Sequence, residues 1–333
     1  SIVPYVRAGN LVILESTVPP GTLKNTVVPL LEKSGLSVGK ELFVAHSPER
    51  VLPGRILHEL VENSRIVGGI DEESTERARE LYATFVKGQI LCTDSTTAET
   101  VKLIENTYRD INIALANELA KICEALGINV WEAIELANYH PRVNVHRPGP
   151  GVGGHCIPID PWFIVEAVSE RAQLIRLGRS INDSMPDIVV DVVKTLVPRQ
   201  GKIAVLGLAF KGNVDDIRES PAITVIDKLQ EQGYATGIYD PYVKFFRGEC
   251  ISQIEPVLDG ADLVLVLTDH AEFGKIDPNK IARRVNSKLV FDTRNCLNRE
   301  AWEEAGFVYR LLGDGKSLEI VTSGQREAAA TQD

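Results

Sequence analysis

The sequence lacks the features that mark a membrane, secreted or metal-binding protein. None of its apolar runs approaches the ~20 residues that span a bilayer, and a basic, apolar leader is not recognisable in it. Its five cysteines are scattered, without a Cys-x-x-Cys pair or a His/Cys cluster at zinc spacing. We therefore expect a cytoplasmic protein without a membrane span, a disulfide framework or a metal site.

An excess of positive charge is also lacking. The formal net charge is −10, and nucleic-acid binding needs a basic face. We therefore expect no nucleic-acid partner, although an anionic small molecule could bind in a locally basic pocket. The 333 residues, of which 44% are hydrophobic and 25% charged, suffice for two domains with cores of their own.

What is present is an alternation of strands and helices around one long helical segment. A run from residue 96 to 126 contains no Gly or Pro and is stopped by Gly127. A second helical stretch, 160–196, is interrupted near Arg171 and Pro186. The pattern further predicts the end of a helix at 1–8, strands at 11–14, 42–45, 65–68 and 89–92, helices at 23–33 and 72–84, and late strands at 203–207, 236–239, 263–267, 289–291 and 308–310. The late alternation implies a parallel sheet.

One stretch, residues 148–163, has the composition of a tightly constrained loop. Four glycines precede Cys156, and Asp160 stands between two prolines at an apparent helix start, where the helix dipole favours anions. A glycine-rich turn with a small apolar cysteine is the ordinary interpretation of such a stretch. The adjacent His155 and the nearby Asp160 favour a functional thiol instead.

This stretch resembles the catalytic loop of the UDP-glucose/GDP-mannose dehydrogenase family, and the resemblance runs from Glu15 to about Asn295. His155 and Trp162-Phe163 resemble the members that oxidise UDP-N-acetylmannosamine; in the glucose and GDP-mannose members a serine normally precedes the cysteine and a lysine the aspartate. The resemblance implies an α/β fold. Its parts would be the remainder of an N-terminal NAD-binding Rossmann domain (1–95), a central helical dimerisation and catalytic domain (96–198), a Rossmann-like UDP-sugar-binding domain (199–320) and a frayed tail (321–333). Because no Gly-x-Gly-x-x-Gly fingerprint occurs in a strand-to-helix turn, where a Rossmann domain carries it, we expect an N-terminally truncated enzyme, inactive by itself.

The resemblance also implies site residues, each at the position that matches a family motif. The catalytic residues would be Cys156, Lys102, Asn106, Asp160, Glu49 and Thr17. Substrate would be bound by Arg50, Val51, Lys102, Asn106, Arg109, His140, Arg142, Gly153, Lys211, Gly212 and Arg294. Thr17 and Arg218 would contact NAD.

The residues alone leave simpler interpretations open. Glu15–Thr22 is also a proline turn that caps a helix, and His46–Arg55 is also a solvated surface loop. Lys102, Asn106 and Arg109 share one helical face, which is also the pattern of an exposed stripe with weak pairs such as Glu99 with Lys102.

The chemistry expected is the NAD-dependent, four-electron oxidation of UDP-N-acetyl-D-mannosamine at C6, through a cysteine thiohemiacetal and thioester. The alternatives are UDP-N-acetylglucosamine as substrate, a UDP-sugar-binding module without activity, and a cysteine hydrolase or acyltransferase built on His155 and Cys156. The last is disfavoured because adjacent residues rarely point at each other. A homodimer or higher homo-oligomer is expected.

Overall fold

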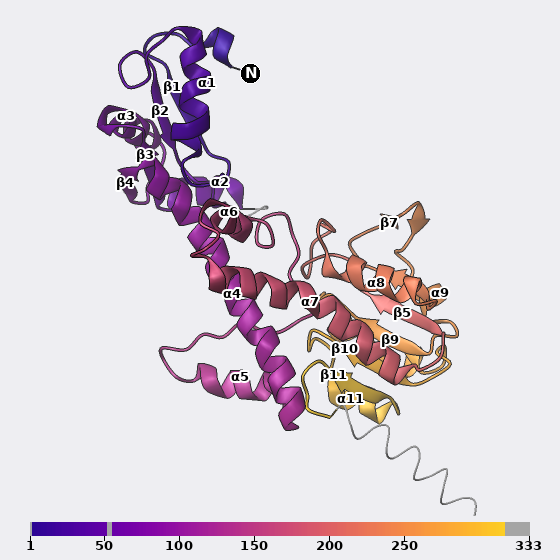
Figure 1. Ribbon diagram of the computed structural model, residues 1–333. Coiled ribbons are helices and arrows are strands. Elements are labelled where there is room, and N and C mark those ends of the chain that lie inside the picture. The colour runs from indigo at the N-terminus through magenta and orange to yellow at the C-terminus, as the bar shows by residue number, and fades with distance from the viewer. Residues whose placement is uncertain (1, 52–54, 317–333) are drawn as a thin grey trace, which may run out of the picture. The chain divides into compact units, whose positions relative to one another are not determined.

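The computed structural model describes residues 2–51 and 55–316, which form two compact units. The first comprises Ser1–Tyr108 and Ile159–Arg176, and the second Arg109–Pro158 and Leu177–Asp333. Two long helices, α4 (Ser95–Leu126) and α7 (Gln173–Leu196), each begin in the first unit and continue into the second (Figure 1). The predicted frayed tail, 321–333, lies outside the described residues.

The first unit contains a four-stranded sheet in the order β1-β2-β3-β4. The strands are β1 (Leu11–Leu14), β2 (Phe43–His46), β3 (Arg65–Gly69) and β4 (Ile90–Asp94), so the four predicted strands are confirmed to within two residues. β1 runs parallel to β2 and β3 parallel to β4, but β2 and β3 are antiparallel. Because β1 and β2 are parallel, their carboxyl ends lie at the same edge.

Each face of this sheet is covered by one helical segment. Helix α3 (Glu72–Ala83) packs through Ala78 and Tyr82, and the segment Leu23–Ser34 covers the opposite face through Leu23 and Leu31. The second segment consists of a π-helical turn (η2, Leu23–Val27), α1 (Val28–Leu31) and a 3₁₀ turn (η3, Glu32–Ser34). It is irregular because Pro29 lacks the N–H that a continuous α-helix needs. The predicted helix end at residues 1–8 is wrong, since only a 3₁₀ turn forms there (η1, Val3–Tyr5).

Four further helices differ in how well the sequence predicts them. Helices α2 (Ile56–Glu62) and α5 (Val130–Asn138) were not predicted. The predicted break near Arg171 is confirmed, because α6 (Asp160–Ala167) ends before α7 begins. The predicted break at Pro186 is wrong: α7 continues through this residue. The proline only deprives the Asn182 carbonyl of its usual helical donor.

The second unit contains a fully parallel sheet in the order β11-β10-β9-β5-β6. Its strands, each predicted to within one residue, are β5 (Lys202–Leu206), β6 (Ala235–Tyr239), β9 (Leu263–Val266), β10 (Leu289–Asp292) and β11 (Val308–Leu311). A short hairpin of β7 (Phe245–Phe246) and β8 (Glu249–Cys250) follows β6.

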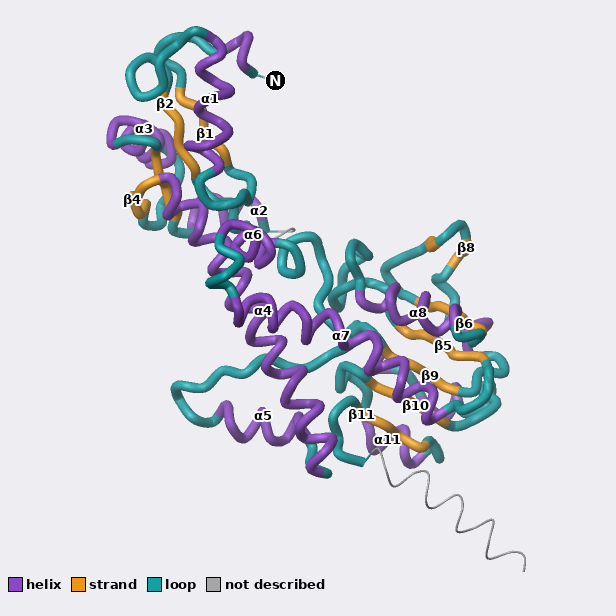
Figure 2. Tube along the Cα trace, viewed as in Figure 1, coloured by secondary structure: helices purple, strands orange, loops and turns teal. Residues whose placement is uncertain are grey.

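Helices cover both faces of this sheet, as Figure 2 shows. Alternate strand residues divide between two cores: Ile203 and Val205 pack with α7 and α8 (Pro221–Glu231), whereas Ala204 and Leu206 face the other way. The second core is completed by the end of α4, α5, α9 (Glu255–Leu258), η4 (Phe273–Lys275), α10 (Pro278–Ile281) and α11 (Arg299–Glu304). Among the described helices, none has the length and apolarity to cross a membrane.

Helices α4 and α7 approach closely in the second unit because Gly178 lies at their contact. A Cβ at this position would lie 3.5 Å from Ile111 and 3.6 Å from Ala114. The approach allows the buried Arg179 guanidinium to meet the buried Asp110 carboxylate at 2.5 Å, and Arg179 also pairs with Asp183.

A chain of buried hydrogen bonds extends from this ion pair to the glycine-rich stretch. Asn182 Nδ2 donates to Asp110 Oδ1 (2.8 Å), and Asn117 Nδ2 donates to Asn182 Oδ1 (2.9 Å). Asn117 Oδ1 then accepts the backbone N–H of Gly149 (2.9 Å). The helix pair thus fixes the first glycine of the stretch that leads to Cys156.

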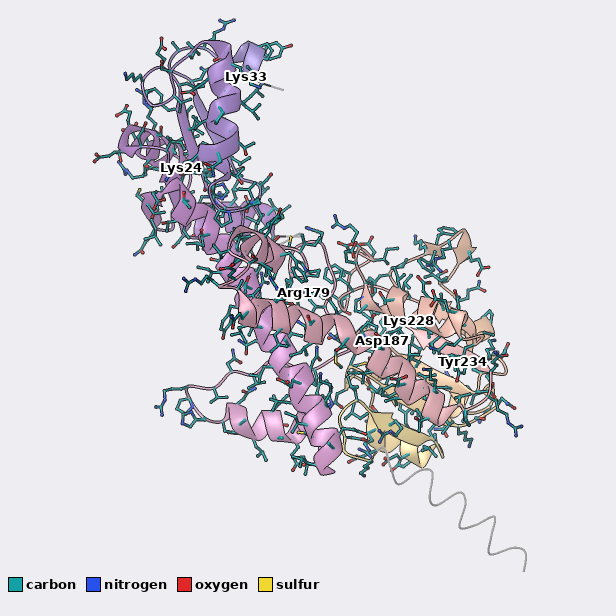
Figure 3. The ribbon with its side chains drawn as sticks, in the orientation of Figure 1. Lys24, Lys33, Arg179, Asp187, Lys228 and Tyr234 are labelled. Atoms are coloured by element: carbon teal, nitrogen blue, oxygen red, sulfur yellow. The ribbon has the colours of Figure 1, made fainter. Side chains whose placement is uncertain are left out.

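The Arg179–Asp110 pair should be far more important for stability than a surface pair that joins α7 to α8. We predict that Arg179→Ala lowers the free energy of unfolding by about 3–5 kcal/mol, because it leaves a buried carboxylate without its cation. Lys228→Ala removes the largely exposed bridge to Asp187 (2.6 Å) and should cost less than about 1 kcal/mol (Figure 3). Urea unfolding followed by the fluorescence of Trp131 and Trp302 measures both; losses of equal size would contradict the prediction.

Candidate active site

The glycine-rich loop is fixed at its later glycines by backbone atoms of neighbouring segments. A Cβ on Gly153 would lie 2.6 Å from the Glu219 carbonyl oxygen, and Gly154 N donates to the Arg218 carbonyl (3.0 Å) with φ at +89°. Gly151, at φ +135°, passes over the Asn182 carbonyl that Pro186 leaves without a helical donor. Larger residues would not fit here, so the glycines serve close packing as well as turning.

The loop presents the Cys156 thiol, which is half-buried and lies 3.0 Å from Nδ1 of the exposed His155. The expectation that these adjacent side chains do not meet is therefore wrong. The imidazole can take the thiol proton or stabilise the thiolate. His155 has no other hydrogen bond among the described residues, so no third side chain orients it as in a hydrolase triad.

In the first unit, two predicted catalytic residues meet directly. Asn106 Nδ2, on α4, donates a hydrogen bond to Oδ2 of Asp160, the first residue of α6. Both side chains are buried, so the exposed-stripe interpretation of this helix face is wrong at Asn106. Lys102 lies one turn earlier, half-buried, and makes no hydrogen bond or ion pair with the described part of the chain. Its ammonium group is therefore free to meet a ligand.

Glu99, on the same helix, holds the turn that follows Thr17. Its carboxylate accepts the backbone N–H groups of Gly21 (2.5 Å) and Leu23 (2.8 Å) rather than pairing with Lys102, so that predicted pair is wrong. Burial raises the pKa of Glu99, which these bonds partly offset. Thr17 itself is half-buried at the carboxyl edge of β1 and β2. Its hydroxyl has no hydrogen-bond partner within residues 2–51 and 55–316.

The described part of the loop after β2, residues 47–51, is held by hydrogen bonds and ion pairs, unlike a solvated loop. Glu49 Oε1 accepts the N–H groups of Arg50 (2.6 Å) and Val51 (2.8 Å), and Oε2 lies 3.5 Å from Arg65. The Arg50 guanidinium pairs with Glu105 on α4 (3.0 Å). Burial lowers the pKa of His46 to about 4, so this histidine is neutral at physiological pH.

At the carboxyl edge of the second sheet, several predicted substrate residues come together. Arg294 follows β10 and pairs with Asp269, which follows β9 (3.1 Å). A Cβ on Gly212 would lie 2.3 Å from the Asp269 carbonyl oxygen, and one on Gly149 would lie 2.4 Å from Arg294 Nη1. Lys211, Gly212 and Arg294 thus share one edge with the start of the glycine-rich loop, at the position where parallel sheets bind ligands.

Four other residues predicted to bind substrate or NAD do not join this group. Arg218 is exposed and forms a bidentate pair with Asp216 (2.9 and 2.6 Å). His140 and Arg142 are exposed in the loop after α5 and contact each other, with Arg142 N donating to His140 Nδ1 (3.3 Å). Arg109 is exposed on α4.

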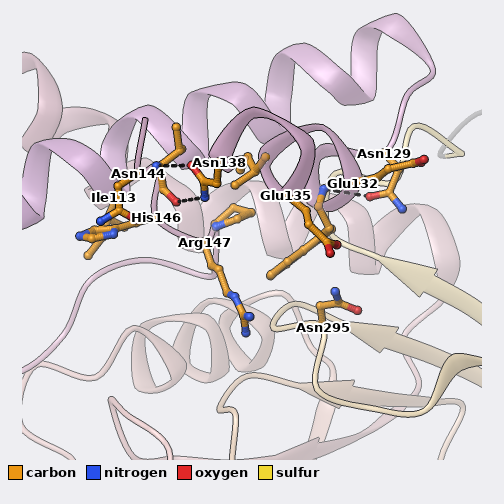
Figure 4. Close-up of a pocket in the computed structure, with 13 residues that line it drawn as sticks. Ile113, Asn129, Glu132, Glu135, Asn138, Asn144, His146, Arg147 and Asn295 are labelled. Atoms are coloured by element: carbon orange, nitrogen blue, oxygen red, sulfur yellow. Dashed lines mark hydrogen bonds between the residues drawn. The ribbon is translucent and has the colours of Figure 1, made fainter. Parts of the chain in front are cut away.

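A cavity of about 900 Å³ lies between α5 and the segment that leads into the glycine-rich loop. Asn138 holds that segment by accepting from Val145 N (2.7 Å) and donating to Val145 O (3.0 Å). Figure 4 shows Arg147 directed into the space between α5 and Asn295. Sequence reasoning missed this cavity, because α5 was not predicted; Asn295, next to Arg294, was the one available signal. No cluster of three potential metal-binding side chains occurs among the described residues.

Comparison with known proteins covers nearly the whole chain. Family models for the UDP-glucose/GDP-mannose dehydrogenase family match residues 1–86 as the NAD binding domain, 96–184 as the central domain and 204–299 as the UDP binding domain.

Individual relatives carry related names. The chain is 55% identical to a UDP-N-acetyl-D-mannosamine dehydrogenase of Methanocaldococcus jannaschii, over 95% of this chain and 73% of the relative. It is 47% identical to an NDP-N-acetyl-D-galactosaminuronic acid dehydrogenase of Ralstonia solanacearum, over 88% and 72%. The solved structure of a UDP-D-ManNAc dehydrogenase from Pyrococcus horikoshii superimposes with a TM-score of 0.88 at 45% identity, over 94% of this chain and 75% of that one.

The fully parallel second sheet, the thiol-bearing loop and these matches lead to one conclusion: the chain belongs to the UDP-glucose/GDP-mannose dehydrogenase family, a family of NAD-dependent UDP-sugar dehydrogenases.

Proposed function

We propose that the protein oxidises UDP-N-acetyl-D-mannosamine at C6 to UDP-N-acetyl-D-mannosaminuronate in two oxidations, the second of which proceeds through a covalent cysteine intermediate. The observation that carries the proposal is the Cys156 thiol, half-buried beside His155 on a loop that neighbouring backbone holds in place. The names of the relatives from M. jannaschii and P. horikoshii support this substrate.

In the first step the C6 alcohol loses a hydride and a proton and becomes an aldehyde. His155 then takes the thiol proton, and the sulfur of Cys156 bonds to C6 to form a thiohemiacetal. Loss of a second hydride from C6 leaves a thioester. Water adds to its carbonyl, the S–C6 bond breaks, and the carboxylate leaves with the thiol restored. NAD, when bound, supplies the hydride acceptor for both oxidations, and water supplies the second carboxylate oxygen.

Lys102 and Asn106 stabilise the oxygen on C6 when it carries negative charge, because donors are most effective where charge develops. Asp160 activates the hydrolytic water: its buried carboxylate is held by Asn106 at the start of α6, where the helix dipole favours the charged form. Glu49 is a second proton shuttle. Four peptide units separate Cys156 from Asp160, so their Cα atoms lie within about 14 Å in any arrangement of the chain.

Thr17 orients the nicotinamide end of NAD and the hydrolytic water, and its free hydroxyl at the carboxyl edge of β1 and β2 suits this role. Arg218 binds the NAD pyrophosphate. Because its guanidinium is bonded to Asp216, a phosphate would have to displace that carboxylate.

The UDP moiety binds at the carboxyl edge of the second sheet. Lys211 and Arg294 contact the phosphates and the sugar, with Gly212 and Gly153 allowing close approach of backbone, and the cavity beside Asn295 takes the nucleoside end. Arg50, Val51 and Arg109 complete the contacts to the UDP-sugar. His140 and Arg142 reach the sugar of a neighbouring subunit.

This assignment divides the chain into an NAD-binding region (1–95), a central region (96–198) and a UDP-sugar-binding region (199–320). A UDP-sugar-binding module without activity is the second candidate, because Lys211, Gly212, Arg294 and the cavity all belong to one unit. UDP-N-acetylglucosamine is the alternative substrate, and parallel assays with both sugars decide between them.

Cys156→Ala should abolish acid formation, because without the thiol no thioester can form. NADH release, followed by absorbance, should fall from two per sugar to one or none, and mass spectrometry should find no uronate. Cys250→Ala, which removes an exposed thiol in the β7–β8 hairpin, is the control and should keep wild-type yield. Two NADH per sugar from Cys156→Ala would disprove the covalent mechanism.

Arg294→Ala should weaken UDP binding about tenfold or more, since it removes a charge-assisted contact to phosphate. Titration calorimetry with UDP alone measures the affinity. Arg299→Ala, at a half-buried arginine paired with Glu303 on α11, controls for loss of net positive charge. Equal affinities for the two variants would remove Arg294 from the site. UDP binding without any NAD binding to the wild-type protein would favour the binding module.

We further propose a homodimer formed through the second half of α4. Leu115, Ile122 and Leu126 share one face of this helix and are between 45% and 66% exposed, as is Leu136 on α5. A second copy would cover them.

If so, Ile122→Glu should shift the mass measured by light scattering towards that of a monomer, because it buries a charge in the interface. Phe245→Glu alters a more exposed apolar residue in the hairpin and should leave the mass unchanged. A wild-type monomer would refute the proposal.

A further inference from the structure

The loop after β5, which carries Lys211 and Gly212, is tied to the sheet by a buried histidine. We propose that His270 is a positioning residue for UDP binding: it fixes the direction in which Lys211 projects without touching the nucleotide itself. This inference rests on the proposed UDP site and adds a residue to which that site assigns no role.

His270 is fully buried and bonds at both ring nitrogens. Its Nδ1 accepts the backbone N–H of Asn213 (2.9 Å), and its Nε2 lies 3.0 Å from Asp240 Oδ2. Because Nδ1 accepts, a neutral ring carries its proton on Nε2 and donates it to Asp240. The ring therefore connects the loop after β5 with the end of β6.

Asp240 is the fixed point of this connection. Its Oδ2 accepts from Leu208 N (2.7 Å) and Ala209 N (3.0 Å), and its Oδ1 accepts from Tyr242 N (2.8 Å) and Val243 N (3.0 Å). Burial acts to raise the pKa of this carboxyl, but the bonds from His270 and the backbone outweigh it and lower the pKa. The carboxylate is thus charged and held in place. It bonds directly to the start of the loop at Leu208 and Ala209, and through His270 to Asn213 near the other end.

The ring itself cannot turn away. Tyr242 stacks on it with centroids 5.0 Å apart, and Phe273 meets it edge-on at 5.2 Å. Asn213 adds a second tie, because its Oδ1 accepts the N–H of Ala271 (2.9 Å).

Lys211 depends on these ties for its direction. It is exposed and has no ion pair or hydrogen bond among the described residues, so its own side chain does not fix it. Two residues later the backbone takes φ +63° at Asn213, a left-handed conformation that is uncommon in non-glycine residues, although asparagine adopts it more readily than most. The bond that Asn213 N donates to His270 Nδ1 and the bond that Ala271 N donates to Asn213 Oδ1 hold the backbone in this conformation.

Two substitutions separate the two bonds of the ring. His270→Asn places an amide oxygen near the position of Nδ1 and keeps an acceptor for Asn213 N, whereas His270→Gln places an amide nitrogen near Nε2 and keeps the donor to Asp240. Both lose the ring stacking. We expect UDP affinity, measured by titration calorimetry, to fall tenfold or more in His270→Gln and no more than about threefold in His270→Asn, with similar losses in melting temperature.

A double-mutant cycle tests whether His270 acts through Lys211. Once Lys211→Ala has removed the ammonium, His270→Gln should weaken UDP binding no further. Asn213→Ala, a change at the surface that spares the core, should weaken UDP binding several-fold and serves if His270→Gln does not fold.

The outcomes separate the inference from the site on which it rests. Equal losses in His270→Gln and His270→Asn, or additive losses with Lys211→Ala, overturn the role of His270 and leave the UDP site standing. A wild-type protein that binds no UDP removes the site and the inference together.

Discussion

The second unit depends on the buried contact between Arg179 and Asp110. Without it the two helices would place a cation and an anion in apolar surroundings, each at a cost of several kcal/mol. With it they form a rigid pair. Asp110 also accepts a hydrogen bond from Asn182, which bonds to Asn117, and Asn117 holds the backbone N–H of Gly149. A loop rich in glycine is entropically costly to order, and this chain of bonds is one of the contacts that order it.

Both units use buried polar side chains to hold loops in place, but they take these side chains from different elements. In the first, a helix residue serves a loop: Glu99 on α4 accepts two backbone N–H groups of the turn at Gly21–Leu23. In the second, carboxylates and a histidine at strand ends do so, as Asp240 shows with four backbone donors. In both arrangements, polar atoms that burial would penalise are hydrogen-bonded to the loops that follow strands and hold them in place.

The sequence predicted strands, the long helix and the parallel second sheet because these depend on local periodicity and on stops such as Gly127. It failed where tertiary contacts decide. The antiparallel pairing of β2 and β3 is invisible to periodicity, and α7 continues through Pro186 because its apolar face is buried on both sides of the proline. Family motifs indicated Asn106 and Asp160, whereas their contact required the fold. Asp240 and His270 belong to no motif, and no role was predicted for Asp110; the positions of these three side chains in the fold, where all are buried, became visible only in the structure.

The glycine-rich loop rests largely on main-chain carbonyl groups, those of Asn182, Arg218 and Glu219. A main-chain carbonyl is supplied by any amino acid. The surroundings of the loop should therefore accept a wide choice of side chains at Arg218 without moving the sulfur, whereas a single added methyl group at Gly153 would collide with the Glu219 carbonyl oxygen, which no rotamer change can move. At Arg218, the residue that supplies the carbonyl group can vary, whereas the glycine that packs against it cannot.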